Sequence, residues 1–227
     1  MQFLPFLILL CFIVGLFQVY RLGREDFMFL RKNITLEQLF NYAFLAGLIG
    51  LLLARLVSTL SSGKGSPAIT FFSPYVSGLS LTGGIVGGFA FLLFLCRRQK
   101  LPSGRLLDVF SLAVVTVLPI GYIGVIFLSP KIILIQTAFA VLFLLLAIFF
   151  NLFLYTRSLR GELREGSVTG LFFLAYGIQG ILGILLARPG NLVSAVTLDN
   201  ILLVLLLIGS VIFLVFNERR TFSRKRR

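Results

Sequence analysis

The sequence predicts an all-α, polytopic membrane protein with seven transmembrane helices, an N-terminus outside and a C-terminus in the cytoplasm. The chain has 227 residues and is 58% hydrophobic, which is too apolar for a soluble domain. Its apolar residues fall into seven runs, each close to the roughly 20 residues with which an α-helix crosses the hydrocarbon core. The basic residues lie in short clusters between these runs, as expected for membrane topology signals.

The apolar runs are expected to form one membrane domain over residues 1–227, ending in a basic cytoplasmic tail at 218–227. Each run is interpreted as a helix, because a helix satisfies its own backbone hydrogen bonds in lipid. No internal repeat and no matched pair of broken helices is visible. The expected spans are 3–20, 39–60, 76–96, 106–128, 132–155, 168–187 and a short one at 201–216.

The first span is expected to stay as an anchor. No positive charge precedes it, whereas Arg21 and Arg24 follow it, which is the reverse of a secretory signal. Cys11 lies inside this span without the small residues that a lipidation box requires before its cysteine. We interpret Cys11 as a packing residue.

The second span contains Arg55, a charged residue well inside an apolar run. Charges inside a membrane are costly and often functional, so a buried role is favoured. The alternative is that the Arg55 side chain extends to the outer interface, since the residue lies about one turn from the end of the span.

The third and fourth spans form a hairpin around a basic turn. Glycines at four-residue spacing, within Gly83–Gly88, predict close helix contacts. The fourth span ends in Gly121-Tyr122-Ile123-Gly124, at the same membrane level as Thr82. Thr82 and Tyr122 are therefore predicted to face one cavity near the outer leaflet. Asp108 is expected to form an ion pair with Arg105 or with the basic turn.

The later spans carry few polar residues. Tyr176, Gly177 and Gln179 form a polar step in the sixth span. The side chains of Asn41, Gln136 and Asn151 are expected to hydrogen-bond between helices. The basic tail is interpreted as a topology anchor on the anionic cytoplasmic leaflet, with a nucleic-acid or anionic-lipid patch as the alternative.

The distribution of Lys and Arg predicts the orientation. With the N-terminus outside, seventeen of these residues are cytoplasmic, three are outside and Arg55 is within a span. The cytoplasmic ones are Arg21, Arg24, Arg31, Lys32, Arg97, Arg98, Lys100, Arg105, Arg157, Arg160, Arg164, Arg219, Arg220, Arg224, Lys225, Arg226 and Arg227, and those outside are Lys64, Lys131 and Arg188.

The absence of histidine excludes several classes of chemistry. Imidazole base catalysis, histidine-ligated zinc and a Ser-His-Asp triad all require the missing side chain. The two cysteines lie in or beside apolar runs and predict neither a disulfide nor a metal site. No metal, no cofactor and no nucleic-acid partner is expected.

Several motifs, taken in order, resemble the bacterial prolipoprotein diacylglyceryl transferase family, a group of seven-helix enzymes. Thr82-Gly83-Gly84 stands where the family has His-Gly-Gly, and Gly121–Val125 stands where it has Gly-Arg-Ile/Leu-Gly-Asn. The remaining matches are Leu36–Gln38 with Ala54–Leu56, the basic turn Arg97–Pro102 with Leu106–Asp108, Tyr176-Gly177, and Val196–Leu206 at the start of the last helix.

The resemblance implies a location in the bacterial cytoplasmic membrane and a lipid-modifying reaction. The family transfers a diacylglyceryl group from phosphatidylglycerol to the cysteine thiol of a lipobox in a secreted preprotein. Membrane phospholipid, with phosphatidylglycerol favoured, and a lipobox-type segment are therefore the expected partners.

The family's ionisable positions are replaced in this chain. Thr82 stands for the histidine, Tyr122 and Gly180 for arginines, and Val125 for the asparagine of the signature. No residue is therefore assigned a catalytic role. The expected lipid-binding residues are Arg55, Thr82, Gly83, Gly84, Tyr122, Tyr176 and Gln179, between the third, fourth and sixth helices.

Three functions remain open from the sequence. The favoured one is a degenerate, lipid-binding family member with weak or no activity, because losing donors from a phosphate clamp commonly costs a few kcal/mol. The second is an active transferase that uses the substituted residues. The third is a transporter or membrane scaffold on the same fold.

Overall fold

The computed structural model describes residues 3–26, 29, 31–32, 34–62, 79–128, 133–187 and 197–225. These residues contain seven helices that are long and apolar enough to cross a membrane, and none of them forms a strand. The predicted all-α fold with seven spans is confirmed. The orientation of the termini stays a prediction.

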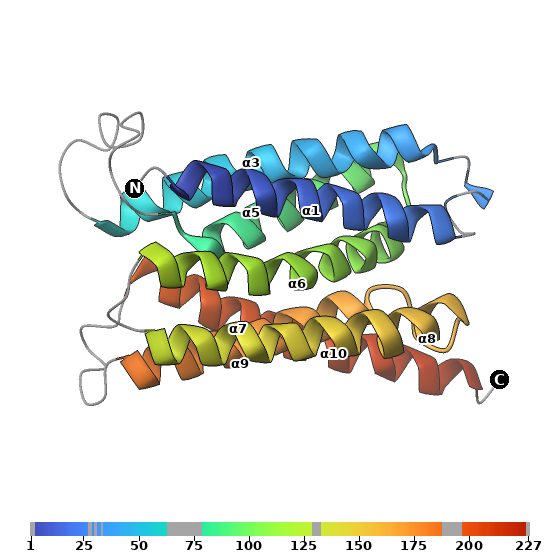
Figure 1. Cartoon of the computed structure of the whole chain (residues 1–227). Helices are drawn as coiled ribbons and strands as arrows, with labels where there is room; N and C mark the ends of the chain where they lie inside the picture. Colours follow the sequence, from blue (N-terminus) through green and yellow to red (C-terminus); the bar gives the residue numbers. More distant parts are fainter. Residues whose placement is uncertain are drawn as a thin grey trace. The chain divides into compact units, whose positions relative to one another are not determined.

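The helices follow one another along the chain as shown in Figure 1. A π-helical segment, η2, joins α7 to α8, so that these three elements form one continuous span. The elements are α1 (Phe3–Glu25), α3 (Leu36–Ser62), α5 (Leu81–Gln99), α6 (Ser103–Leu128), α7 (Ile133–Phe149), η2 (Phe150–Leu154), α8 (Tyr155–Leu159), α9 (Ser167–Ala187) and α10 (Leu198–Lys225).

Polar capping residues set the starts of three helices, and two of these starts lie earlier than hydropathy predicted. Thr35 and Gln38 exchange hydrogen bonds of 3.2 Å between side chain and backbone, a capping box that begins α3 at Leu36 rather than 39. The Thr197 hydroxyl accepts from the backbone of Asn200 at 3.4 Å, and α10 begins at Leu198 rather than 201. Ser80 caps α5, which begins at Leu81; the predicted start at 76 lies outside the described residues.

The helices group into two compact units. Unit 1 consists of Met1–Phe44 and Pro102–Phe172, and unit 2 consists of Leu45–Leu101 and Phe173–Arg227. Unit 1 thus contains α1, α6, α7 and α8, whereas unit 2 contains α5 and α10. The single membrane domain stays a prediction.

Unit 1 is built around α6, which packs against α1 and α7. In its interior, the Gln18 side chain donates to Asn151 at 2.7 Å, and Asn151 donates to Thr116 at 3.0 Å. Asn151 lies within η2, where the wider helical turn changes the direction of its side chain relative to α7. The predicted interhelical role is confirmed for Asn151. Among the described residues, the buried side-chain oxygen of Gln136 has no hydrogen-bond partner, and the same role for Asn41 stays a prediction.

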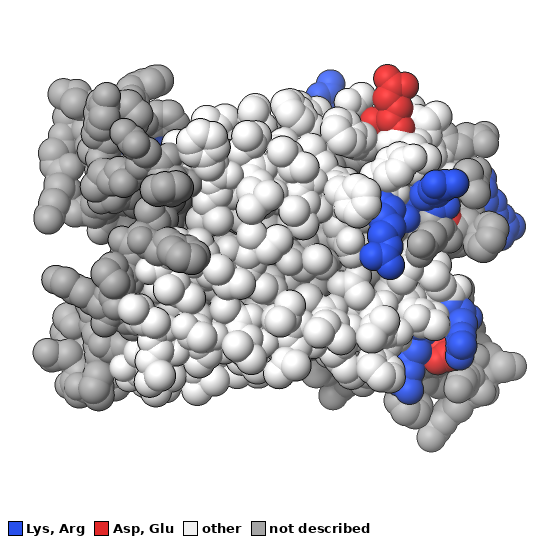
Figure 2. Space-filling model, in the orientation of Figure 1, with Lys and Arg blue, Asp and Glu red and all other residues white. Residues whose placement is uncertain are grey.

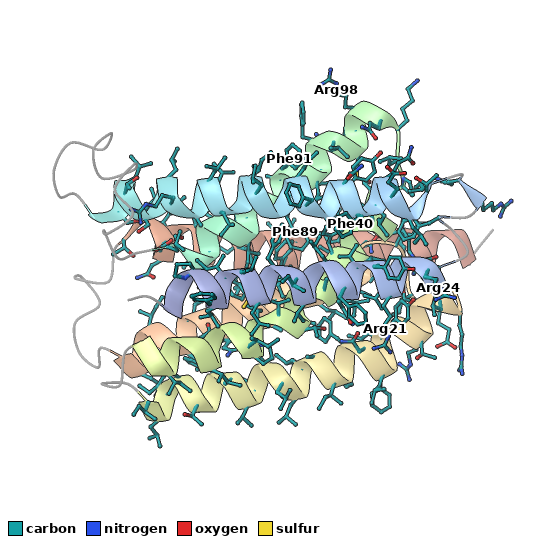
Figure 3. The ribbon with its side chains drawn as sticks, turned by 45° about the horizontal axis from the view of Figure 1, so that its top comes forward. Arg21, Arg24, Phe40, Phe89, Phe91 and Arg98 are labelled. Carbon is teal, nitrogen blue, oxygen red and sulfur yellow. The ribbon has the colours of Figure 1, made fainter. Side chains whose placement is uncertain are left out.

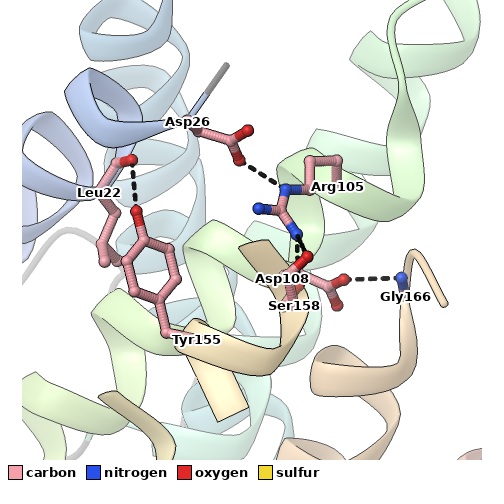
Figure 4. Close-up of polar contacts among 7 residues, drawn as sticks. All are labelled: Leu22, Asp26, Arg105, Asp108, Tyr155, Ser158 and Gly166. Carbon is pink, nitrogen blue, oxygen red and sulfur yellow. Dashed lines mark hydrogen bonds and ion pairs between the residues drawn. The ribbon is translucent and has the colours of Figure 1, made fainter. Parts of the chain in front are cut away.

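A second polar network lies at the end of unit 1 where α1 ends and α6 begins (Figure 4). Arg105 donates to the Asp26 carboxylate at 2.5 Å and to the Ser158 carbonyl at 3.1 Å, and it also bonds the Ser158 hydroxyl. Asp26 and Arg105 are only 1% and 5% exposed, so this is a buried ion pair. It ties the end of α1 to the start of α6 and the end of α8.

Asp108 does not form the predicted ion pair. Its carboxylate accepts from the backbone of Gly166 at 2.7 Å and from the backbone and hydroxyl of Thr169 at 2.8 Å. Arg105 instead pairs with Asp26. The prediction failed because the first turn of α9 offers unpaired N–H groups, and the Asp108 carboxylate caps them from a neighbouring helix.

Glycines bring the helices of unit 2 into close contact. A Cβ added to Gly84 would lie 3.2 Å from the Cβ of Ala54, and one on Gly87 would lie 2.5 Å from a Leu53 methyl group. The predicted contact face of α5 therefore packs on α3. On the neighbouring side of α5, Phe89 meets Phe173 edge to face at 4.8 Å between ring centroids.

Candidate functional site

Ser80 organises the polar cluster at the start of α5. Its backbone is extended, and its hydroxyl accepts from the backbone N–H of Gly83 at 2.8 Å, as in an ordinary helix N-cap. Its own N–H donates to the carbonyl of Ala54 at 3.1 Å, which fixes the start of α5 against α3. Ser80 therefore sets where the following residues, including Thr82, point.

Asp199 is the carboxylate of this cluster. The Ser80 hydroxyl donates to an Asp199 oxygen in a short hydrogen bond. Asp199 lies in the first turn of α10, where the helix dipole stabilises a negative charge, and it is half-buried. The positive end of α5 is thus already next to a carboxylate of the chain itself.

Thr82 and Tyr176 form a buried pair. Their hydroxyl oxygens lie 3.2 Å apart, with Thr82 on α5 and Tyr176 on α9, and both residues are buried. Either hydroxyl can be the donor in this bond. The structure therefore brings together two of the residues that the sequence predicted for the site. We call Ser80, Thr82, Tyr176 and Asp199 the α5 cluster.

Three further predicted residues belong to the same unit as the α5 cluster. Gln179 is buried one turn after Tyr176 on α9, and Arg55 is half-buried on α3, next to the Ala54 carbonyl that accepts from Ser80. Gly83 packs on Val57, since a Cβ added there would lie 2.7 Å from the Val57 Cβ.

Gly84 has the same packing role against Ala54. Lipid binding by these two glycines stays a prediction.

Gly180 stands where the family resemblance places an arginine. A Cβ added to Gly180 would collide with a methyl group of Leu203, which is a buried residue of α10. The space into which a longer side chain would extend is therefore filled by Leu203. A return to arginine at this position requires Leu203 to move.

Tyr122 belongs to unit 1. Its ring stacks on Phe143, with ring centroids 5.3 Å apart and planes 20° apart, and it also lies 6.0 Å from the ring of Phe139. The cavity predicted for Thr82 and Tyr122 together stays a prediction. The side chain of Val125 lies outside the described residues.

The chemistry available in the α5 cluster is that of hydroxyls and one carboxylate. Such groups can hydrogen-bond a headgroup or accept a proton, but they cannot neutralise a phosphate as paired arginines do. Among the residues that the structure describes, no group of three potential metal ligands was found.

Sequence reasoning missed Asp199, the carboxylate of the α5 cluster. The residue lies just outside the expected seventh span, and its partner Ser80 is 119 positions away. The available signal was local: a threonine followed by an acid at the start of an apolar run predicts a helix N-terminus. That signal predicts where the helix starts, but it does not predict which residue hydrogen-bonds to Asp199.

Comparison with family models gives one match. The model described as LGT: Prolipoprotein diacylglyceryl transferase matches residues 4–130, which is more than half of the chain. Comparisons with curated proteins and with solved structures gave no match.

Proposed function

Because the chain belongs to the prolipoprotein diacylglyceryl transferase family, we propose that it is a phospholipid-binding member with weak or no transferase activity. The observation that carries this proposal is the bond between Thr82 and Tyr176. At the position of the family histidine, two uncharged hydroxyls satisfy each other in a buried place. Neither supplies a positive charge for the phosphate of phosphatidylglycerol.

Two features of unit 2 support the same proposal. Asp199 brings negative charge to the start of α5, where a helix N-terminus would otherwise favour a phosphate. Leu203 fills the space next to Gly180, where the family resemblance places an arginine. Together they oppose the charge stabilisation that phosphatidylglycerol chemistry needs.

Lipid binding is proposed at the outer edge of the cluster. Arg55 and Asp199 are half-buried, whereas Thr82 and Tyr176 are buried. A headgroup would therefore meet the Arg55 guanidinium and the Asp199 carboxylate before it reached the paired hydroxyls. A guanidinium forms charge-assisted hydrogen bonds to phosphate, so Arg55 is the residue that we assign to the headgroup.

The test of this binding role is Arg55→Gln in the purified full chain. We expect several-fold weaker binding of labelled phosphatidylglycerol, because one charge-assisted contact is lost. The matched control is Arg98→Gln, an exposed arginine at the other end of unit 2 (Figure 3). Equal binding by Arg55→Gln and the unchanged protein would contradict the assignment.

A second candidate function is favoured by the bond between Ser80 and Asp199. A carboxylate held by a hydroxyl could accept the proton of a lipobox thiol, which would make the chain an active transferase with substituted residues. In that case Asp199→Asn would abolish measurable transfer to a lipobox peptide while binding of phosphatidylglycerol persists. On the first candidate, transfer is negligible before and after the substitution.

A further inference from the structure

One face of α1 carries aromatic and basic side chains around a hollow. Phe17, Tyr20, Arg21 and Arg24 line a cavity of about 370 Å³. Their spacing of three, four and seven residues places all four on one side of the helix. Arg21 and Arg24 lie near the C-terminal end of α1 in Figure 3. We call these four residues the α1 face.

Contacts on the opposite side of α1 fix the rotation of the helix, so that the α1 face points away from the interior of unit 1. Val19 and Leu22 are buried, and the Leu22 carbonyl accepts from the Tyr155 hydroxyl at 3.0 Å. Gln18 donates to Asn151, which fixes the rotation of α1 within unit 1. Phe17 and Tyr20 remain 64% and 43% exposed. The outward direction of the face is therefore built into the unit.

The charge of the α1 face is not neutralised by the described carboxylates. Arg21 and Arg24 are exposed, and neither forms an ion pair with a described acidic side chain. Asp26, two residues after Arg24, is buried and pairs with Arg105. The Asp26 carboxylate is inside and the two guanidinium groups are outside. Two full positive charges outweigh the single negative charge of Glu25 together with the partial negative charge of roughly one half at the C-terminus of α1.

This arrangement matches the headgroup region of an anionic phospholipid. Arg21 and Arg24 would hold the phosphate, and the Tyr20 hydroxyl can donate to it as well. Phe17 lies one turn further into the apolar part of the span, where a lipid has its glycerol and acyl chains. From Phe17 to Arg24 the helix rises about 10 Å, comparable with the distance from the acyl boundary to the headgroup.

We propose that the α1 face binds the headgroup of one anionic phospholipid in the leaflet that the C-terminal end of α1 reaches. On the predicted topology this is the cytoplasmic leaflet, whose anionic lipids attract basic residues. The site lies in unit 1 and is separate from the α5 cluster of unit 2. Figure 2 shows uncharged residues over the middle of the visible surface and the Lys and Arg side chains beyond this middle part.

The test is a lipid titration of the detergent-solubilised full chain, followed by native mass spectrometry. The probe is dioleoyl phosphatidylglycerol, with dioleoyl phosphatidylcholine as the zwitterionic comparison. We expect R21Q/R24Q to weaken the tightest phosphatidylglycerol binding by at least tenfold, since each basic residue near a membrane surface contributes roughly fivefold. Phosphatidylcholine binding should not change.

A matched control distinguishes a specific lipid site from a general effect of the net positive charge on lipid binding. R97Q/R98Q removes two exposed arginines from the end of α5 and should leave the tightest binding unchanged. Phe17→Ala should weaken lipid binding without any change in charge, and inorganic phosphate should not compete.

Three results would overturn the proposal: equal binding by R21Q/R24Q and the unchanged protein, an equal loss in R97Q/R98Q, or full competition by inorganic phosphate. The last would indicate a site for soluble anions. Arg55→Gln affects the other unit, so failure here is distinguishable from failure of the proposed function.

Discussion

At the scale of single residues, the polar groups of the α5 cluster hydrogen-bond to one another and to the backbone. Thr82 and Tyr176 satisfy each other, and Ser80 uses its hydroxyl twice, toward Gly83 and toward Asp199. Buried polar groups need such partners, because an unpaired one costs about 1–3 kcal/mol. The cluster is therefore stable without a ligand, unlike a set of clustered arginines.

The pair of Thr82 and Tyr176 predicts a measurable coupling. In a double-mutant cycle with Thr82→Val and Tyr176→Phe, we expect a coupling free energy of unfolding of about 0.5–1 kcal/mol, which is typical of hydrogen bonds between membrane helices. Thermal or chemical unfolding in detergent measures it. Additive effects of the two substitutions would mean that the bond does not form in the folded protein.

Two glycines of α9 are expected to differ in how far their replacement by alanine destabilises the protein. A Cβ on Gly177 would lie 2.9 Å from the Cβ of Leu207 and 3.3 Å from its Cα, and neither atom can rotate away. A Cβ on Gly180 meets only side-chain atoms of Leu203, which can change rotamer. Gly177→Ala should therefore destabilise unit 2 by about 1–3 kcal/mol, and Gly180→Ala by less. Equal melting temperatures of the two variants would contradict this packing.

At the scale of the helices, the number and type of the elements were predictable, and so were the starts of α1, α7 and α9 to within one residue, whereas the starts of α3 and α10 were not. Hydropathy identifies a span because the hydrocarbon core demands a length of apolar residues. Thr35 and Thr197 are polar, so hydropathy excluded them and the turns that they cap.

The hydrogen-bond and ion-pair partners of the polar residues were predictable from the sequence only in part. Thr82 and Tyr176 were selected from the sequence, and the structure pairs them. The bond of Ser80 to Asp199 and that of Asp26 to Arg105 join residues of different helices, and no local pattern specifies such pairs.

The ion pair between Asp26 and Arg105 predicts a large structural effect. Both groups are buried where α1, α6 and α8 meet, so removing one partner leaves the other buried charge without its ion pair. We expect Arg105→Ala or Asp26→Ala to cost roughly 3 to 5 kcal/mol of unfolding free energy.

Arg157→Ala is the control for this effect, since Arg157 and Glu162 are exposed and 3.9 Å apart. That exposed pair should contribute about 1 kcal/mol or less. A similar melting temperature for Arg105→Ala and Arg157→Ala would contradict a buried ion pair.

At the scale of the whole molecule, the chain is a transferase-like membrane protein, and its described residues contain seven helices that are long and apolar enough to cross a membrane. Its orientation rests on the distribution of basic residues. In a variant without Cys11 and Cys96, we expect a membrane-impermeant maleimide to label Ser66→Cys in intact spheroplasts and to label Arg160→Cys only after lysis. Labelling of Arg160→Cys in intact spheroplasts would reverse the topology.

On the proposed function, the packing of the family scaffold is kept while its charged positions are replaced. The glycines of α5 fit against α3, and the resemblance to the family implies that Thr82 and Gly180 stand where it has a histidine and an arginine. This contrast underlies the central claim, which is that the fold is kept for binding lipid and not for transferring it.

The most direct test of that claim is a single-turnover transfer measurement. Protein equimolar with a lipobox peptide is incubated with phosphatidylglycerol labelled in its acyl chains, and a family enzyme with the histidine and arginines is the control. We predict that the protein retains labelled lipid while no label reaches the peptide in the time that the control needs for completion. The claim would be contradicted if label reached the peptide at a rate near that of the control. Loss of this transfer in Asp199→Asn would then establish an active transferase.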